Sequence, residues 1–161
     1  MIKMKLAVFS DAHGRGERMA KVVKDLKGVD YLLYAGDVVG DLKEVQSRKG
    51  DFKVLAVRGN CDFNSTYSEE LVFEVGGKVI LLTHGHKYNI KYGIDRLYYR
   101  AKEVEADIVI FGHTHCRYAQ KEDGVIFFNP GSISLPRDGW PPSYGVIEIN
   151  NEGIKYKHCD F

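Results

Sequence analysis

The first apolar run of the chain reads Leu6-Ala7-Val8-Phe9, and it leads through Ser10 directly into Asp11-Ala12-His13. The run is short and ends at polar residues, which favours a buried strand over a helix. Similar runs recur at Tyr31–Ala35, Val54–Val57, Val79–Leu82 and Ile108–Phe111. We therefore predict five buried strands, and these strands decide the fold.

Helical spacing separates the first two of these runs. Apolar residues recur there at intervals of three or four, at Met19, Val22, Val23 and Leu26. Gly28 then offers a stop signal. A second and weaker helical stretch is expected near Asp41, and a third from about Gly93 to Val104, with apolar residues on one side.

The last third of the chain is richer in strand patterns. Strands are expected at Val125–Phe128, Tyr144–Ile149 and Ile154–His158, and Pro136–Ser143 is expected to be an irregular loop. Early alternation of strands and helices, followed by a β-rich tail, predicts an α/β fold with helices outside two packed sheets. No repeat or linker divides the pattern, so we expect one domain over residues 1–161.

Composition points to a soluble globular chain in a reducing compartment. Apolar residues make up 44% of the 161 residues, and the formal net charge is +1, which argues against nucleic acid or an anionic membrane as a partner. No segment is long and apolar enough for a secretory signal or a membrane span. Three cysteines, an odd number without C-x-x-C spacing, make a disulfide framework improbable. Cytoplasm is the expected location.

Ligand-type side chains follow all five of the apolar runs named first. They are Asp11, His13, Asp37, Asn60, His84, His113 and His115, and we call them the candidate ligands. In open α/β sheets the ligand crevice lies outside the carboxyl ends of the strands, so these side chains are expected to converge. Asp, Asn and His suit divalent ions such as manganese, iron or zinc. If Asp37 bridges, the set supplies eight ligands, enough for two ions with positions left open.

Each candidate ligand alone also has a simpler explanation. Asp11 suits a helix N-cap or a turn, Asp37 and Asn60 suit turns, and His84 suits a hydrogen-bonded histidine at a strand end. A coincidence at five successive strand ends is a weaker explanation than one shared metal site.

The ordered series resembles the calcineurin-like metallophosphoesterases. The matching motifs are Asp11-x-His13, Gly36-Asp37, Gly59-Asn60, His84 and Gly112-His113-x-His115. The chain is more similar still to the small YfcE-like phosphodiesterases, in Arg58-Gly59-Asn60-Cys61-Asp62, Thr83-His84-Gly85-His86 and Asn129-Pro130-Gly131-Ser132. The resemblance spans roughly Lys5 to Ile149.

The resemblance implies a four-layer α-β-β-α sandwich with two mixed sheets and a metal site at the carboxyl ends of strands. One ion would be held by Asp11, His13, Asp37 and His115, and the other by Asp37, Asn60, His84 and His113. Manganese is favoured, with iron, zinc or nickel as alternatives. The implied activity is metal-dependent hydrolysis of a small phosphodiester, by in-line attack of a hydroxide that bridges the two ions. Asp37 and Asn60 are expected to serve catalysis, and a homo-oligomer, dimer or larger, stays open.

One position departs from the common family pattern. Many members carry a histidine directly after the asparagine, whereas this chain has Cys61. Cys61 is either a small buried side chain or a residue near the phosphate, beyond the metal ligands. His86 would orient a ligand or line the site.

Other readings of the sequence stay open. The same fold can serve as a scaffold without catalysis, as in the related subunit of the eukaryotic retromer coat, and a nucleotide- or nucleic-acid-specific hydrolase is a third possibility. The aromatic and basic segment after His86 is either a substrate contact or an ordinary amphipathic helix, and we favour the helix. Arg137 and Trp140 belong to a pocket rim or to a subunit contact.

Overall fold

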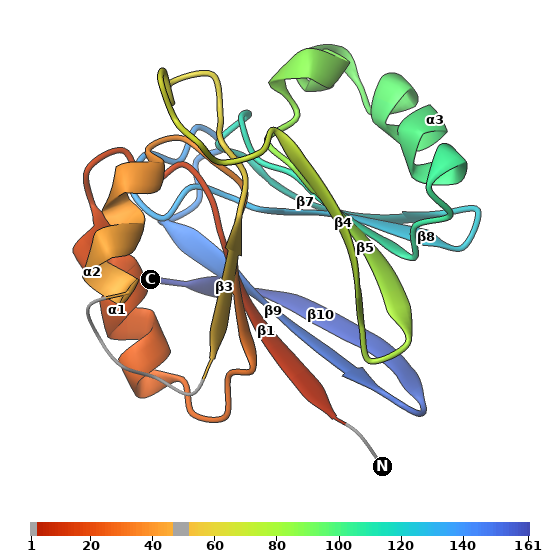
Figure 1. Cartoon of the computed structure of the whole chain (residues 1–161), viewed down its shortest axis with the longest axis horizontal. Helices are drawn as coiled ribbons and strands as arrows, with labels where there is room; N and C mark the ends of the chain where they lie inside the picture. Colours follow the sequence, from red (N-terminus) through yellow and green to blue (C-terminus); the bar gives the residue numbers. More distant parts are fainter. Residues whose placement is uncertain (1–2, 47–51) are drawn as a thin grey trace.

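Two five-stranded sheets form the centre of the computed structural model, which describes residues 3–46 and 52–161 (Figure 1). The first sheet has the order β10-β9-β1-β2-β3. Its strands are β1 (Met4–Phe9), β2 (Tyr31–Tyr34), β3 (Lys53–Ala56), β9 (Ser143–Asn150) and β10 (Gly153–Asp160). The second sheet has the order β4-β5-β6-β8-β7. Its strands are β4 (Glu70–Val75), β5 (Lys78–Thr83), β6 (Ile108–Ile110), β7 (Arg117–Glu122) and β8 (Val125–Pro130).

Both sheets mix parallel and antiparallel pairs. Strands β1, β2 and β3 run parallel to one another, and so do β5, β6 and β8. The remaining strands pair antiparallel at the sides. Because parallel strands end at the same edge of a sheet, the polar residues that follow them are brought together.

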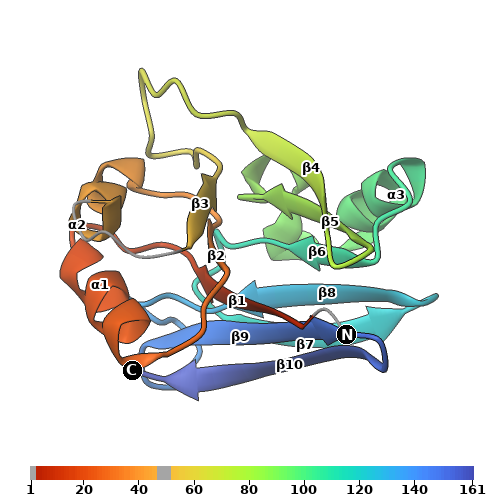
Figure 2. The same cartoon turned by 60° about the horizontal axis from the view of Figure 1, so that its bottom comes forward.

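Helices cover the outer face of each sheet (Figures 1 and 2). The first sheet is covered by α1 (Gly16–Asp25), with the 3₁₀ turn η1 (Val39–Leu42) and α2 (Lys43–Gln46) beside it. The second sheet is covered by α3 (Asp95–Glu103), which follows the 3₁₀ turns η2 (His86–Tyr88) and η3 (Ile90–Tyr92). The predicted helical stretches are therefore confirmed, although the one near Asp41 is split into two short pieces.

Three apolar cores separate these layers. The inner core joins the two sheets, for example through Val8 and Leu33 of the first and Ile80 and Ile110 of the second. One outer core lies under α1, and the other lies under α3. This arrangement confirms the predicted α-β-β-α sandwich with two mixed sheets.

Two strands were missing from the sequence prediction. Strands β4 and β7 lie at opposite edges of the second sheet, and both are only partly buried. An edge strand pairs on one side only, so it needs no continuous apolar run. The apolar-run criterion therefore missed them, whereas it found every central strand. Within the described residues, no helix combines the length and the apolar character that a bilayer crossing requires.

Candidate metal centre

The candidate ligands converge where the parallel strands of the two sheets end. Two groups have ligand atoms within 4.8 Å of one another. The first group is Asp11, His13 and His115, and the second is Asp37, His84 and His113. Asn60 adjoins the second group, because its Oδ1 lies 3.1 Å from His84 Nε2. The structure thus brings together all seven residues that the sequence singled out.

Asp11 is fully buried and only half satisfied. Its Oδ2 accepts hydrogen bonds from Ser10 Oγ at 2.8 Å and from the His113 backbone N–H at 3.1 Å. Its Oδ1 has no hydrogen-bond partner, and the Nε2 atom of His115 lies 3.4 Å away. The Nε2 atom of His13 is also buried without a partner. Unpaired buried polar atoms are costly, and a divalent cation between them would satisfy both, so the donor set fits a metal ion.

Asp37 belongs to the second group and also faces His13 of the first. Its Oδ2 is 3.3 Å from His84 Nε2 and 3.7 Å from His13 Nε2. Its Oδ1 accepts the backbone N–H of Cys61 at 2.9 Å, which fixes the orientation of the carboxylate. One oxygen is therefore anchored, and the other faces members of both groups.

Backbone carbonyls orient two of the histidines. The Nδ1 atom of His84 donates to the Ala35 carbonyl at 2.6 Å, and Nδ1 of His115 donates to the Leu135 carbonyl at 2.7 Å. A histidine that donates from Nδ1 presents the lone pair of Nε2 to a metal. Both rings therefore point their ligand atoms at the carboxylates.

The site carries strong electrostatic coupling. Burial alone would raise the pKa of Asp37, but its hydrogen bond to His84 and the positive charge there hold that pKa well below its usual range. Burial alone would lower the pKa of His84, but Asp37 and Asp11 raise it. Burial, with repulsion from His84 and Lys91, lowers the pKa of His113 to about 4, so this imidazole is neutral at pH 7. The two carboxylates attract a positive charge, and the neutral imidazole of His113 offers a lone pair to a cation.

Five of the seven candidate ligands have left-handed backbone conformations. The φ angles lie between 41° and 70° at Asp11, His13, Asp37, His113 and His115. Residues other than glycine seldom adopt this conformation, and such strained residues gather at functional sites.

Glycines allow the backbone to approach the ligands closely. A Cβ atom on Gly59 would lie 2.0 Å from Asp37 Oδ1, and one on Gly112 would lie 2.9 Å from Asp11 Oδ2. The backbone therefore approaches both carboxylates at positions where only glycine fits without displacing them.

Cys61 and His86 both lie beside the candidate ligands. Cys61 is exposed, so the alternative of a small buried side chain is wrong. Partial desolvation of the thiol and the negative charge of Asp37 raise its pKa, which favours the protonated thiol. The His86 ring lies 5.4 Å from the His84 ring and 6.2 Å from the His113 ring. His86 therefore lines the site but lies outside both ligand groups.

Several positioning residues were not assigned a role from sequence. Asp62 accepts the backbone N–H groups of Asp37, Val39 and Gly59 at 2.8–3.0 Å, which holds two loops together. The Asn129 amide donates to the Gly112 carbonyl, and Ser132 Oγ donates to the Asp11 carbonyl. Motifs quoted above contain all three, but their contacts with distant backbone groups gave no local signal.

Comparisons with known proteins agree with this fold. The profile of the calcineurin-like phosphoesterase superfamily domain matches residues 4–152. The probable metallophosphoesterase YsnB of Bacillus subtilis is 35% identical over 159 residues, covering 98% of this chain and 91% of YsnB. The phosphodiesterase YfcE of Escherichia coli is 32% identical over 169 residues, covering 90% of this chain and 88% of YfcE.

Solved structures show the same architecture. A predicted phosphoesterase from Streptococcus pneumoniae has a TM-score of 0.85 at 32% identity, covering 99% of this chain and 91% of that one. Vps29 of Entamoeba histolytica, solved with Zn²⁺, has a TM-score of 0.74 at 22% identity, covering 98% and 99%. At that identity the likeness to Vps29 shows the fold alone.

Fold, ligand groups and relatives together define a metal-dependent phosphoesterase. The chain belongs to the calcineurin-like phosphoesterase superfamily.

Proposed function

We propose that this chain is a phosphodiesterase that holds two divalent cations. Asp11, His13, Asp37 and His115 would hold one cation, and Asp37, Asn60, His84 and His113 would hold the other. The observation that carries this proposal is the place of Asp37, whose Oδ2 lies 3.3 Å from His84 Nε2 and 3.7 Å from His13 Nε2. A carboxylate between two histidine groups suits a ligand shared by two ions. Manganese is the favoured ion.

The bound cations would supply Lewis-acid chemistry, lowering the pKa of a water and neutralising charge on the phosphate. The chain itself supplies the frame for that chemistry. Asp11 and Asp37 bring negative charge into a buried setting, and Nδ1 donation by His84 and His115 aims Nε2 inward. Asn60 is exposed at this site and would contact both ion and substrate. The protonated thiol of Cys61 is no nucleophile, but its backbone N–H anchors Asp37.

Two features favour diesters with good leaving groups. YfcE, a relative at 32% identity, is named a phosphodiesterase. In addition, Cys61 replaces the histidine that many family members carry there, so no imidazole at this position protonates the leaving oxygen. General-acid catalysis of that step typically contributes about 10²–10⁴-fold. Esters of acidic alcohols, such as phenols, depend less on that help.

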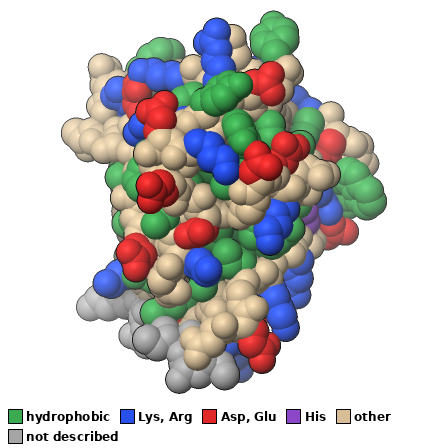
Figure 3. Space-filling model, turned by 90° about the vertical axis from the view of Figure 1, so that its right-hand side faces the viewer, with side chains coloured by type: hydrophobic (Ala, Val, Ile, Leu, Met, Phe, Trp, Pro, Cys, Tyr) green, Lys and Arg blue, Asp and Glu red, His purple; other side chains and the backbone are tan. Residues whose placement is uncertain are grey.

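The alternatives have less support. A scaffold without catalysis would not need all seven candidate ligands to meet, although the fold likeness to Vps29 keeps this alternative in view. A nuclease would need a basic surface for the phosphate backbone. On the face drawn in Figure 3, acidic and basic side chains are interspersed instead, and the net charge is only +1.

Metal analysis combined with two substrates tests the proposal. We expect purified protein to bind close to two equivalents of Mn²⁺ and to hydrolyse bis(4-nitrophenyl) phosphate faster than 4-nitrophenyl phosphate. A chelator should abolish turnover, and added Mn²⁺ should restore it. Protein that binds no divalent ion and hydrolyses neither ester would contradict the proposal and favour the scaffold.

A further inference from the structure

A cavity beside the candidate ligands has no role in the chemistry described above. Its volume is about 730 Å³, inside the range of roughly 300–1,000 Å³ common for small-molecule sites. Thr114 lines it, and Thr114 lies in the chain between His113 and His115. The cavity therefore adjoins the loop that carries two of the candidate ligands.

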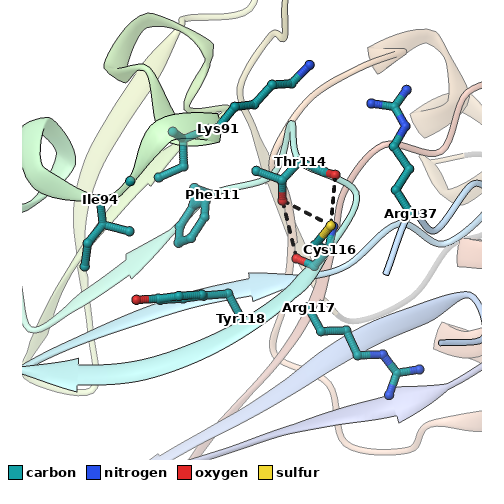
Figure 4. A pocket seen from close by; sticks show the side chains of 10 residues that line it. Lys91, Ile94, Phe111, Thr114, Cys116, Arg117, Tyr118 and Arg137 are labelled. Carbon is teal, nitrogen blue, oxygen red and sulfur yellow. Dashed lines mark hydrogen bonds between the residues drawn. The ribbon is translucent and has the colours of Figure 1, made fainter. Parts of the chain in front are cut away.

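The floor of the cavity is apolar and aromatic. Ile90 and Phe111 are buried, and Ile94 and Tyr118 are half-buried. The rings of Phe111 and Tyr118 have centroids 5.8 Å apart and are tilted by 58°. Figure 4 shows Ile94, Phe111 and Tyr118 on the same side of the cavity. Such a floor favours an aromatic ring over a flexible alkyl chain as the bound group.

The rim of the cavity is basic. Three lining residues are cationic, namely Lys91, Arg117 and Arg137, and none is acidic. Arg117 is already engaged, since it pairs with Asp160 and donates to the Pro141 carbonyl at 3.1 Å. Among the described residues, Lys91 and Arg137 have no ion-pair partner, and both are exposed. Their charges are available to a ligand, and Figure 4 shows both side chains extending from the cavity wall.

We propose that this cavity binds one ester group of the substrate and selects an aromatic alcohol that carries a further negative charge. The proposal rests on the phosphodiesterase function proposed above. The ring would pack on Phe111 and Ile94, and the anion would pair with Lys91 and Arg137. Hydrolysis then adds water across one P–O bond and yields a phosphate monoester and a free alcohol, one of which keeps the cavity-bound group.

Three matched diesters of 4-nitrophenyl phosphate separate the contributions of ring and charge. Their second ester groups are phenyl, 4-carboxyphenyl and 4-carboxybutyl. We expect the 4-carboxyphenyl ester to have a KM lower than either of the others by about three- to tenfold, the size of one or two partly exposed ion pairs. Chromatography of both alcohols records which P–O bond breaks. Equal KM values for all three esters would overturn the cavity proposal and leave the phosphodiesterase function intact.

Charge-removing variants locate the effect. Lys91→Gln with Arg137→Gln should raise KM for the 4-carboxyphenyl ester toward the phenyl value. Arg96→Gln is the matched control, because Arg96 is exposed, lies near the same segment and does not line the cavity. Arg96→Gln should keep the wild-type ratio of KM values. A double variant that keeps the wild-type ratio would overturn the role of the two cations.

A binding measurement tests the selectivity of the cavity even if no diester is hydrolysed. Saturation-transfer NMR on chelator-treated protein should give a clear signal for 4-hydroxybenzoate and little signal for phenol or valerate. The 4-hydroxybenzoate signal should weaken in the Lys91→Gln, Arg137→Gln variant. Absence of turnover with this binding pattern would refute the phosphodiesterase function but keep the cavity's selectivity. Equal signals for the three small molecules would refute the selectivity.

Discussion

At the scale of single residues, the candidate metal centre contains one carboxylate, Asp11, that the fold buries without full hydrogen bonding. Asp11 Oδ1 is buried and unpaired, with the Nε2 atoms of His115, His84 and His13 at 3.4, 3.8 and 3.9 Å. A buried carboxylate is costly unless a positive charge compensates it. The arrangement therefore indicates that a bound cation would stabilise the native state.

Asp37→Asn tests the shared ligand. The amide is almost the same size but neutral, so we expect loss of metal and a fall in diester hydrolysis of at least about 100-fold, while the fold persists. Elemental analysis and circular dichroism provide the two readouts. Asp25→Asn, the same chemical change at an exposed position, is the control. Near-normal turnover in Asp37→Asn would contradict the shared-ligand role.

Gly59→Ala tests the close approach of the backbone to Asp37. The added Cβ would lie 2.0 Å from Asp37 Oδ1, so the carboxylate must move. We expect metal affinity to fall by about 10–100-fold, as when a ligand's supporting contacts are lost. Gly40→Ala is the matched control, because its Cβ would meet nothing within 4 Å. Unchanged manganese affinity by calorimetry in Gly59→Ala would show that the site tolerates the displacement.

At the scale of elements, the central strands were easier to predict than the edge strands β4 and β7. The central strands are continuous apolar runs, because both of their faces are buried. Strand β4 has only three consecutive apolar residues, flanked by Glu70 and Glu74, and β7 carries Arg117, Gln120, Lys121 and Glu122. Their assignment comes from pairing with β5 and β8, which lie elsewhere in the sequence.

Leu97→Ala tests how α3 is held on the second sheet. Leu97 is fully buried against the outer core, so its truncation should cost about 2–5 kcal/mol of unfolding free energy. Tyr99 lies on the same helix and is 67% exposed. Tyr99→Ala should therefore cost less than about 1 kcal/mol. Denaturant unfolding measures both, and equal losses would mean that α3 is not anchored through Leu97.

At the scale of the whole molecule, the inner core is shared by the two sheets. Val8 and Leu33 come from one sheet, whereas Ile80 and Ile110 come from the other. Neither sheet can bury this face alone, so we expect residues 1–161 to unfold in one cooperative transition. Agreement between calorimetric and van't Hoff enthalpies, measured without metal, would support a single domain. Two resolved transitions would contradict it.

His158 gives the sheet-to-sheet contact a pH dependence. It lies on β10, stacks on Phe128 of β8 with centroids 4.6 Å apart, and donates to the Asn129 carbonyl. Burial and the charge of Arg117 lower its pKa, despite the Asn129 hydrogen bond. The folded state therefore binds this proton less readily than the unfolded state does, so stability is retained above the ordinary histidine pKa of 6.5 and lost as the pH falls below it.

His158→Gln should weaken this dependence, because glutamine keeps a donor but does not titrate. We expect the melting temperature to fall less in the variant than in the wild type when the pH is lowered from 7 to 5. Both proteins are measured with a chelator, so that the candidate ligands contribute equally. An identical loss in the two proteins would show that His158 does not contribute.

The sequence by itself determined the central strands, the main helices and the seven candidate ligands. These features are local: apolar runs report burial, and ligand-type residues directly follow the runs. Only the tertiary structure decided that Asp37 lies between two histidine groups, that Asp62, Asn129 and Ser132 hold the loops, and that a basic-rimmed cavity lies beside them. Those features depend on distances between residues far apart in the chain, and no local pattern encodes such distances.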